Sequence, residues 1–190
     1  MKQAKVLSSN ELRRVLVMCA AGRHGQRNRI ALLLSHYAGL RVGEIASLHW
    51  SDLLESTGAC RREFHLQARN TKANETRAVH LNDLVWRELE RYRVSCNPTV
   101  EKSTPVIPSQ KGNAFSANSL CQLFSKLYTE AGISGASSHS GRRWFITTLA
   151  HNGISPKVIM ELAGHQNLTT TQRYIEVNEK MKQEAVSQLA

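Results

Sequence analysis

Residues 139–153 read HSGRRWFITTLAHNG and residues 162–174 read LAGHQNLTTTQRY, and these two stretches do most to decide the fold. Between them, Ser155 can cap a helix whose first position is Pro156, a residue that fits there because no backbone N–H donor is needed. The expected helices of this part of the chain span about 139–151, 156–163 and 168–175.

The helical pattern extends towards the N-terminus. Ser8 and Glu11 form a capping-box sequence, and apolar residues then recur at helical spacing up to Cys19. A second apolar stripe reaches Tyr37, and Gly39 after it favours the end of a helix. Apolar spacing and cap residues predict further helices over about 42–48, 83–94, 120–128 and 178–189.

One part of the chain alternates between apolar and polar residues instead. Residues 62–69 and 76–81 show this alternation, and the turn-rich stretch 70–74 separates them. The pattern predicts a β-hairpin and leaves a third strand nearby open. The expected fold class is mainly α with a small antiparallel β-sheet (α+β). We expect a single domain over residues 1–177, followed by a tail helix over 178–190.

Composition excludes several classes of protein. The 190 residues include 25 Lys plus Arg and 15 Asp plus Glu, a formal net charge of +10, which favours a polyanionic partner. No apolar run approaches the roughly 20 residues of a membrane helix, and the N-terminus lacks the apolar core of a signal peptide. Four widely spaced cysteines without a CxxC pair favour a reducing interior, and no glycine-rich nucleotide motif is present.

Four short segments carry residues suited to chemistry. In chain order they contribute Arg41 with Glu44, Lys72, His139 with Arg142, and His165 with Tyr174. Positions 139 and 142 share a face at the start of a helix, where free backbone N–H groups favour an anion. Each residue alone is more often structural, so the hypothesis depends on the whole set and its order.

These residue types suit phosphoryl transfer without a metal. Guanidinium groups bind two phosphate oxygens each and keep their charge, so they stabilise a transition state that spreads negative charge over several oxygens. A tyrosine hydroxyl can attack phosphorus to form a covalent ester, while a histidine relays the proton and a lysine protonates the leaving oxygen. No Asp/Glu cluster has the spacing of a metal site, so neither a metal nor another cofactor is expected.

The set resembles the tyrosine recombinase (phage integrase) family in both order and spacing. Besides the two strings above, the matching strings are AGLRVGEIASLHWSDL (38–53) and NTKANETRAVHL (70–81). The resemblance covers nearly all of residues 8–178. It implies a site-specific recombinase or integrase of the kind carried by mobile genetic elements, which breaks and rejoins DNA strands without metal or ATP.

The resemblance implies a phosphate-binding role for three residues and a supporting role for a fourth. Arg41 and Arg142 would clamp the scissile phosphate, and Glu44 would steady the first of these arginines. His165 would hydrogen-bond a phosphate oxygen.

Three other residues would move protons or form the covalent bond. Lys72 would protonate the departing 5′-oxygen, and His139 would accept or donate a proton near the nucleophile. Tyr174 would be the nucleophile that makes a 3′-phosphotyrosine. Because that link keeps the energy of the phosphodiester, rejoining to a new 5′-hydroxyl would need no ATP.

The resemblance also implies partners. Double-stranded DNA would be the substrate, with self-association into a dimer or tetramer on it, no membrane and no nucleotide. The compartment would be the prokaryotic cytoplasm, at the nucleoid when DNA is bound. Candidate phosphate contacts are Arg23, Arg27, Arg61, Arg62, Lys111, Arg143 and Arg173.

The chain departs from the family pattern in two places. Ser140-Gly141 replaces the commoner Asp-Leu, which we expect to alter packing rather than chemistry. Many relatives carry an N-terminal core-binding domain, whereas only about ten residues precede the first expected helix, so we expect none in this chain. The apolar stripe of residues 178–190 is compatible with docking on a neighbouring copy or on its own core.

Two other functions stay open. A type IB topoisomerase-like activity would relax DNA with the same active-site chemistry. A non-catalytic module would bind recombination sites and compete there with full-length enzymes, although pure binding would not need Tyr174.

Overall fold

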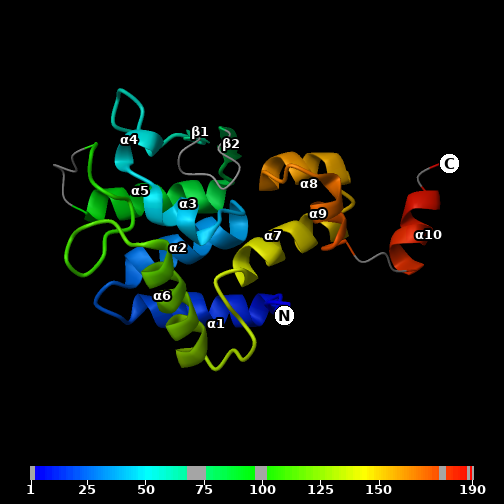
Figure 1. The fold of residues 1–190 in the computed structure, drawn as a ribbon, viewed down its shortest axis with the longest axis horizontal. Coiled ribbons are helices and arrows are strands. Elements are labelled where there is room, and N and C mark those ends of the chain that lie inside the picture. The colour runs from blue at the N-terminus through cyan, green and yellow to red at the C-terminus, as the bar shows by residue number, and fades with distance from the viewer. Residues whose placement is uncertain (1–2, 68–75, 97–101, 176–178, 188, 190) are drawn as a thin grey trace.

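The computed structural model describes residues 3–67, 76–96, 102–175, 179–187 and 189. The fold is mainly helical, as expected, and its described sheet is one short hairpin (Figure 1). The helices are α1 (Ser9–Ala20), α2 (Gly25–Tyr37), α3 (Val42–Ser47), α4 (Trp50–Leu53), α5 (Asp83–Ser95), α6 (Ala117–Glu130), α7 (Ser140–His151), α8 (Pro156–Ala163), α9 (Leu168–Gln172) and α10 (Glu179–Ser187). Within the described residues, no helix is long and apolar enough to cross a membrane.

The hairpin consists of β1 (Glu63–Leu66) and β2 (Arg77–His80), which run antiparallel with Phe64 opposite Val79. Both of these residues are buried, whereas the intervening positions of β1 are exposed, as the alternating pattern predicts. The described part of the sheet has two strands, so the third strand left open by the sequence is not formed there. The predicted turn, with Lys72, lies outside the described residues.

Helix α2 is the centre of the larger core. Its residues from Ile30 to Leu34 are all almost fully buried, because α1, α5 and α7 pack around it. A helix that is apolar on all sides is typical of such a central position. The first turn of α1 carries the predicted capping box: the Ser8 hydroxyl accepts the Glu11 N–H, and the Glu11 carboxylate accepts the Ser8 N–H.

A smaller core joins α7 to α8. It contains Ile146 and Ala150 of α7 with Ile159 and Ala163 of α8. Figure 1 shows α7, α8 and α9 on the opposite side of the molecule from α4 and α5, with the N-terminal end of α7 reaching the larger core. Since α7 packs on both α2 and α8, it fixes the position of the smaller core relative to the larger one.

The Ser140-Gly141 pair lets α7 approach α2 closely. A Cβ on Gly141 would lie 2.8 Å from both Ser35 Cβ and His36 Nδ1, a separation that packed atoms do not allow. Ser140 is fully buried, and its hydroxyl accepts the Ser137 N–H at 2.9 Å. The departure from the commoner sequence therefore has a packing cause in this structure.

The end of α9 and the presence of α4 differ from the sequence expectation. Helix α9 ends at Gln172 rather than near 175, so Tyr174 lies in a turn after the helix. The Tyr174 N–H donates to the Thr171 carbonyl. Helix α4 was not predicted, because it is only four residues long.

Candidate active site

The C-terminal end of α8 gathers three arginines from three different parts of the chain. The last carbonyl groups of a helix have no partner within it. Here three successive carbonyls each accept a hydrogen bond from a guanidinium group. The pairs are Arg77 Nη1 with Leu162 O at 2.9 Å, Arg142 Nη2 with Ala163 O, and Arg41 Nη2 with Gly164 O at 3.1 Å.

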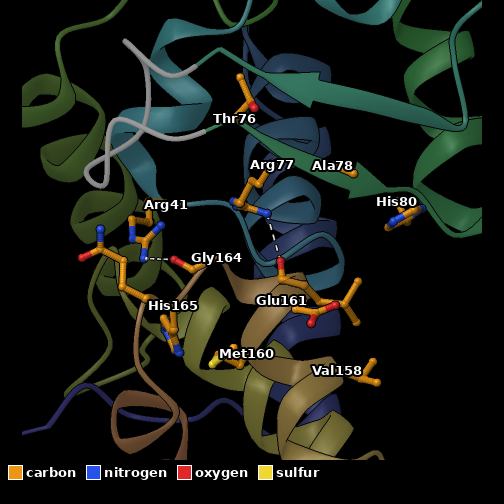
Figure 2. Close-up of a pocket in the computed structure, with 12 residues that line it drawn as sticks. Arg41, Thr76, Arg77, Ala78, His80, Val158, Met160, Glu161, Gly164 and His165 are labelled. Atoms are coloured by element: carbon orange, nitrogen blue, oxygen red, sulfur yellow. Dashed lines mark hydrogen bonds between the residues drawn. The ribbon is translucent and has the colours of Figure 1, made fainter.

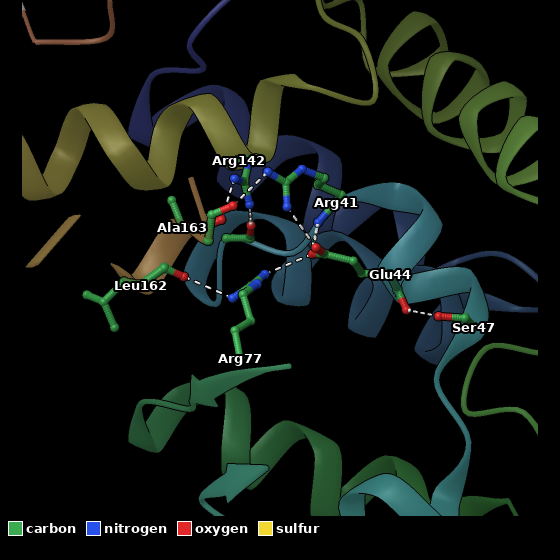
Figure 3. A network of polar contacts seen from close by, with 9 residues as sticks. Arg41, Glu44, Ser47, Arg77, Arg142, Leu162 and Ala163 are labelled. Carbon is green, nitrogen blue, oxygen red and sulfur yellow. Dashed lines mark hydrogen bonds and ion pairs between the residues drawn. The ribbon is translucent and has the colours of Figure 1, made fainter. Parts of the chain in front are cut away.

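Glu44 is the carboxylate that ties two of these arginines together (Figure 3). Its Oε1 accepts from Arg41 Nη1, and its Oε2 accepts from Arg77 Nη2, both at 2.8 Å. The Arg41 backbone N–H also donates to Oε2, which places this carboxylate over the first turn of α3. Burial alone would raise the pKa of Glu44, but Arg77, the Arg41 N–H and the Arg41 guanidinium together lower it below its usual value.

Arg142 is the most deeply buried of the three arginines. Only 6% of the residue is exposed, and its Nη1 donates to the Gly39 carbonyl at 2.7 Å. Gly39 has a φ of +64° and packs so closely against Phe145 that a Cβ there would lie 2.5 Å from the nearest ring atom. Burial and the neighbouring Arg41 charge lower the pKa of Arg142 to about 9, so its guanidinium stays charged at neutral pH.

His165 follows the end of α8 and faces Tyr174. Gly164 before it takes the left-handed conformation that commonly ends a helix, with φ of 61°. The His165 Nδ1 lies 2.8 Å from the Thr171 hydroxyl, and its ring stacks on the Tyr174 ring at 6.0 Å between centroids. Burial, together with the charges of Arg142, Arg41 and Arg77, lowers the pKa of His165 to about 4, so the ring is neutral at pH 7.

A cavity of about 560 Å³ opens beside these groups, between β2 and α8 (Figure 2). Arg41, Arg77 and His165 line its polar side, and Val158 and Met160 of α8 contribute apolar atoms. Glu161 of α8 also lines the cavity, so the anion-binding side is the one formed by the two arginines and the neutral imidazole.

The structure brings five of the seven predicted site residues into this cluster: Arg41, Glu44, Arg142, His165 and Tyr174. His139 caps α7 and is exposed, and its ring makes no hydrogen bond or ion pair with the described residues. Lys72 lies outside the described residues.

Sequence reasoning missed Arg77 and Thr171 as parts of the cluster. Thr171 is one of three consecutive threonines, and nothing in the sequence distinguishes it from the other two. Arg77 occupies a polar position of an alternating strand, where an arginine gives no special signal.

Two of the candidate phosphate contacts, Arg27 and Arg143, make contacts within the protein. Arg27 is 6% exposed, donates to the Pro108 carbonyl at 2.8 Å and lies over the Phe115 ring. Arg143 donates to the Ala4 carbonyl at 2.9 Å and so holds the N-terminal segment against α7. These bonds hold both guanidinium groups against backbone carbonyls of the protein.

The described residues contain no group of three or more His, Cys, Asp or Glu side chains that could hold a metal ion. The hydrogen-bond donors of the cluster are mainly the cationic side chains of its three arginines.

The comparisons with known proteins agree with one another. The model of the phage integrase family matches residues 5–181. The tyrosine recombinase XerD of Oceanobacillus iheyensis is 29% identical over 181 residues, which are 93% of this chain and 59% of XerD. The tyrosine recombinase XerC of Lactobacillus delbrueckii subsp. bulgaricus is 27% identical over 157 residues, 80% of this chain and 51% of XerC. The chain therefore spans between about half and three-fifths of the length of these curated relatives.

Solved structures show the same fold. The crystal structure of XerA recombinase matches with a TM-score of 0.77 and 22% identity, covering 99% of this chain and 66% of that one. The XerH site-specific recombinase bound to its difH substrate matches with a TM-score of 0.71 and 21% identity, covering 98% of this chain and 55% of that one. Since the family model covers nearly the whole sequence and the fold agrees, the chain belongs to the phage integrase family.

Proposed function

We propose that this domain cleaves and rejoins DNA strands through a covalent 3′-phosphotyrosine at Tyr174, without metal or ATP. The observation that carries the proposal is the convergence of Arg41, Arg142 and neutral His165 beside the Tyr174 ring. The relatives XerD and XerC are named tyrosine recombinases, and XerH was solved on a DNA substrate, which supports DNA as the substrate class.

In the proposed reaction, the guanidinium groups of Arg41 and Arg142 bind the non-bridging oxygens of one phosphodiester. Their charge opposes the negative charge that grows on these oxygens during attack. His165 adds a hydrogen bond to the same phosphate, because a neutral ring held at Nδ1 by Thr171 keeps its Nε2 for another partner.

The Tyr174 hydroxyl oxygen then attacks phosphorus and loses its proton to His139. The bond from phosphorus to the 5′-oxygen breaks, and Lys72 supplies the proton that makes the leaving group a 5′-hydroxyl. Attack by a 5′-hydroxyl of another strand reverses these steps, restoring the phosphodiester and the free tyrosine. The number of phosphoester bonds is unchanged, which is why no ATP is required.

Trapping of the covalent intermediate tests this proposal. Nicked duplexes with randomised sequence around the nick lose a short 5′-hydroxyl fragment after cleavage, so the protein stays attached to the DNA. We expect a denaturation-resistant adduct with the wild-type chain and none with Tyr174→Phe. Tyr37→Phe is the matched control, because Tyr37 packs on Trp144 outside the site and should retain the adduct.

The open alternatives give different results in the same assays. Rapid relaxation of a supercoiled plasmid that lacks recombination sites would favour the topoisomerase-like activity. DNA binding without any adduct across the randomised pool would favour the non-catalytic module and contradict the proposal.

We further propose that the domain over residues 1–177 assembles on DNA through the tail helix α10, which docks on a second copy. Val186 and Leu189 are 67% and 86% exposed, and α10 lies beyond α9 and away from α1 to α6 (Figure 1), which supports docking outside its own core. Deletion of residues 178–190 should leave the domain folded, with a cooperative urea transition, and reduce multimers in a gel-shift assay. Unchanged multimers would contradict this arrangement. With DNA as its substrate, we expect the protein in the prokaryotic cytoplasm, where the chromosome lies.

A further inference from the structure

Arg77 is the charged group of the cluster to which the expected chemistry gives no role. It begins β2, and only 10% of its side chain is exposed. Its Nη1 donates to the Leu162 carbonyl at 2.9 Å, and its Nη2 donates to Glu44 Oε2 at 2.8 Å (Figure 3). One side chain of the hairpin thus reaches both α3 and the end of α8.

We propose that Arg77 is a positioning residue, which fixes Glu44 and the C-terminal turn of α8 so that Arg41 and His165 converge on one phosphate. The proposal rests on the proposed function, since it assigns Arg77 a part in arranging that site.

The burial of the Arg77 Nε favours positioning over direct binding of phosphate. A guanidinium group binds a phosphate best when two parallel N–H donors point at it. Both terminal nitrogens of Arg77 donate to the protein, as those of Arg41 and Arg142 also do. The Arg77 Nε is in addition buried without a partner among the described residues, so the Nε edge of this guanidinium group is closed to a phosphate. A buried N–H without a partner is unfavourable, so the surrounding contacts must hold the side chain in place.

The packing of Gly164 locks Arg77 over the turn that leads to His165. A Cβ on Gly164 would lie 2.8 Å from Arg77 Nε and nearer still to its Cδ, so the glycine is needed for this approach. The carbonyl of the same glycine accepts from Arg41. One turn therefore holds Arg41 on one side, Arg77 on the other and His165 at its end.

The strand position of Arg77 extends its influence to the hairpin. Arg77 pairs with Leu66 in the antiparallel register, and Leu66 is 2% exposed. Residues 67–76, which include Lys72, connect these two anchored positions along the chain. Arg77 directly follows this connection along the chain, and its side chain links that end of the connection to α3 and α8.

Three variants separate positioning from a structural or a phosphate-binding role. Arg77→Gln removes the charge and the guanidinium group, whereas Arg77→Lys keeps a charge and part of the reach. Arg29→Gln is the matched control, because Arg29 makes a partly buried ion pair with Glu88 at 2.7 Å between α2 and α5, outside the site.

Single-turnover cleavage of the nicked duplex gives the first readout. A small displacement of reacting groups reduces rates by about 10²-fold, so we expect a loss of that order with Arg77→Gln and partial recovery with Arg77→Lys. DNA affinity and its salt dependence should stay as in the wild type. A rate within twofold of the Arg29→Gln rate overturns the proposal. A salt slope reduced by about one also overturns it, because that result identifies a phosphate contact.

Amide hydrogen exchange gives a readout that needs no catalysis. The Gly164 and His165 N–H groups donate to the Glu161 and Met160 carbonyls at the turn that Arg77 holds. We expect at least tenfold faster exchange of these two amides in Arg77→Gln than in Arg29→Gln, and equal exchange would overturn the positioning role. Absence of any adduct with the wild-type chain would instead refute the proposed function. The exchange result would then still test whether Arg77 fixes the turn at the end of α8.

Discussion

Replacement of Gly164 by alanine is the sharpest test of the contact between α8 and Arg77. Gly164 has a φ of +61°, a conformation that costs an L-residue about 1–2 kcal/mol. The new Cβ would also lie 2.8 Å from Arg77 Nε and nearer to Cδ. Arg77 cannot move away freely, because both of its terminal nitrogens are bound.

The expected loss of stability has two parts that a second glycine can separate. Overpacking of this kind costs about 1–3 kcal/mol, so Gly164→Ala should lose about 2–5 kcal/mol of unfolding free energy in total. Gly153 also has a positive φ, +74°, but a Cβ added there would meet no atom within 4 Å, so Gly153→Ala should lose only the conformational part. The difference between the two variants measures the contact with Arg77.

Urea unfolding followed by far-UV circular dichroism at pH 7 gives both free energies. In an Arg77→Ala background the steric part disappears, and the two glycine substitutions should then cost the same. The reasoning is refuted if Gly164→Ala is no more destabilising than Gly153→Ala in the wild-type background.

Three further outcomes are expected. Gly141→Ala should destabilise by about 1–3 kcal/mol, because its Cβ would overlap Ser35 between α2 and α7, and an unchanged urea midpoint would contradict that close packing. The free energy of unfolding should fall as the pH drops from 6.5 to 4, because the pKa values of buried His36 and His165 are lowered to about 4, so in this range the unfolded chain binds protons that the native state does not. For His36 alone the loss is on the order of 3 kcal/mol. Equal urea midpoints at pH 7 and pH 4.5 would be inconsistent with this loss. Ser8→Ala should cost about 1 kcal/mol through loss of the α1 cap, which thermal unfolding can detect, and a value near zero would count against the capping box.

Local sequence signals predicted most of the fold because they act within a few residues. The Ser8–Glu11 capping box and the Ser155-Pro156 start of α8 both appear in the structure where the sequence places them. Helix α4 escaped prediction because its support is not local: the Trp50 N–H donates to the Thr104 carbonyl, and His49 bridges to Pro105.

The same distinction explains the site. Arg41 and Glu44 are three residues apart, so their ion pair follows from helix geometry at the start of α3. Arg77 donates to Glu44, which is 33 residues away along the sequence, and to Leu162, which is 85 residues away. The alternating pattern of a strand does not predict either partner. The tertiary fold, rather than the strand pattern, gives Arg77 its contacts.

The charge balance of the cluster explains why the site favours an anion. The guanidinium groups of Arg41, Arg77 and Arg142 stand against one carboxylate, Glu44. The end of α8 adds roughly half a negative charge through its carbonyls, which leaves an excess of about 1.5 positive charges in a largely buried region. The lowered pKa values of Arg142 and of His165 are two consequences of that excess, because the region resists any further positive charge. A bound phosphodiester supplies one negative charge, and its charge grows further during attack by an oxygen nucleophile, so the same excess that opposes protonation of His165 stabilises the transition state more than the ground state.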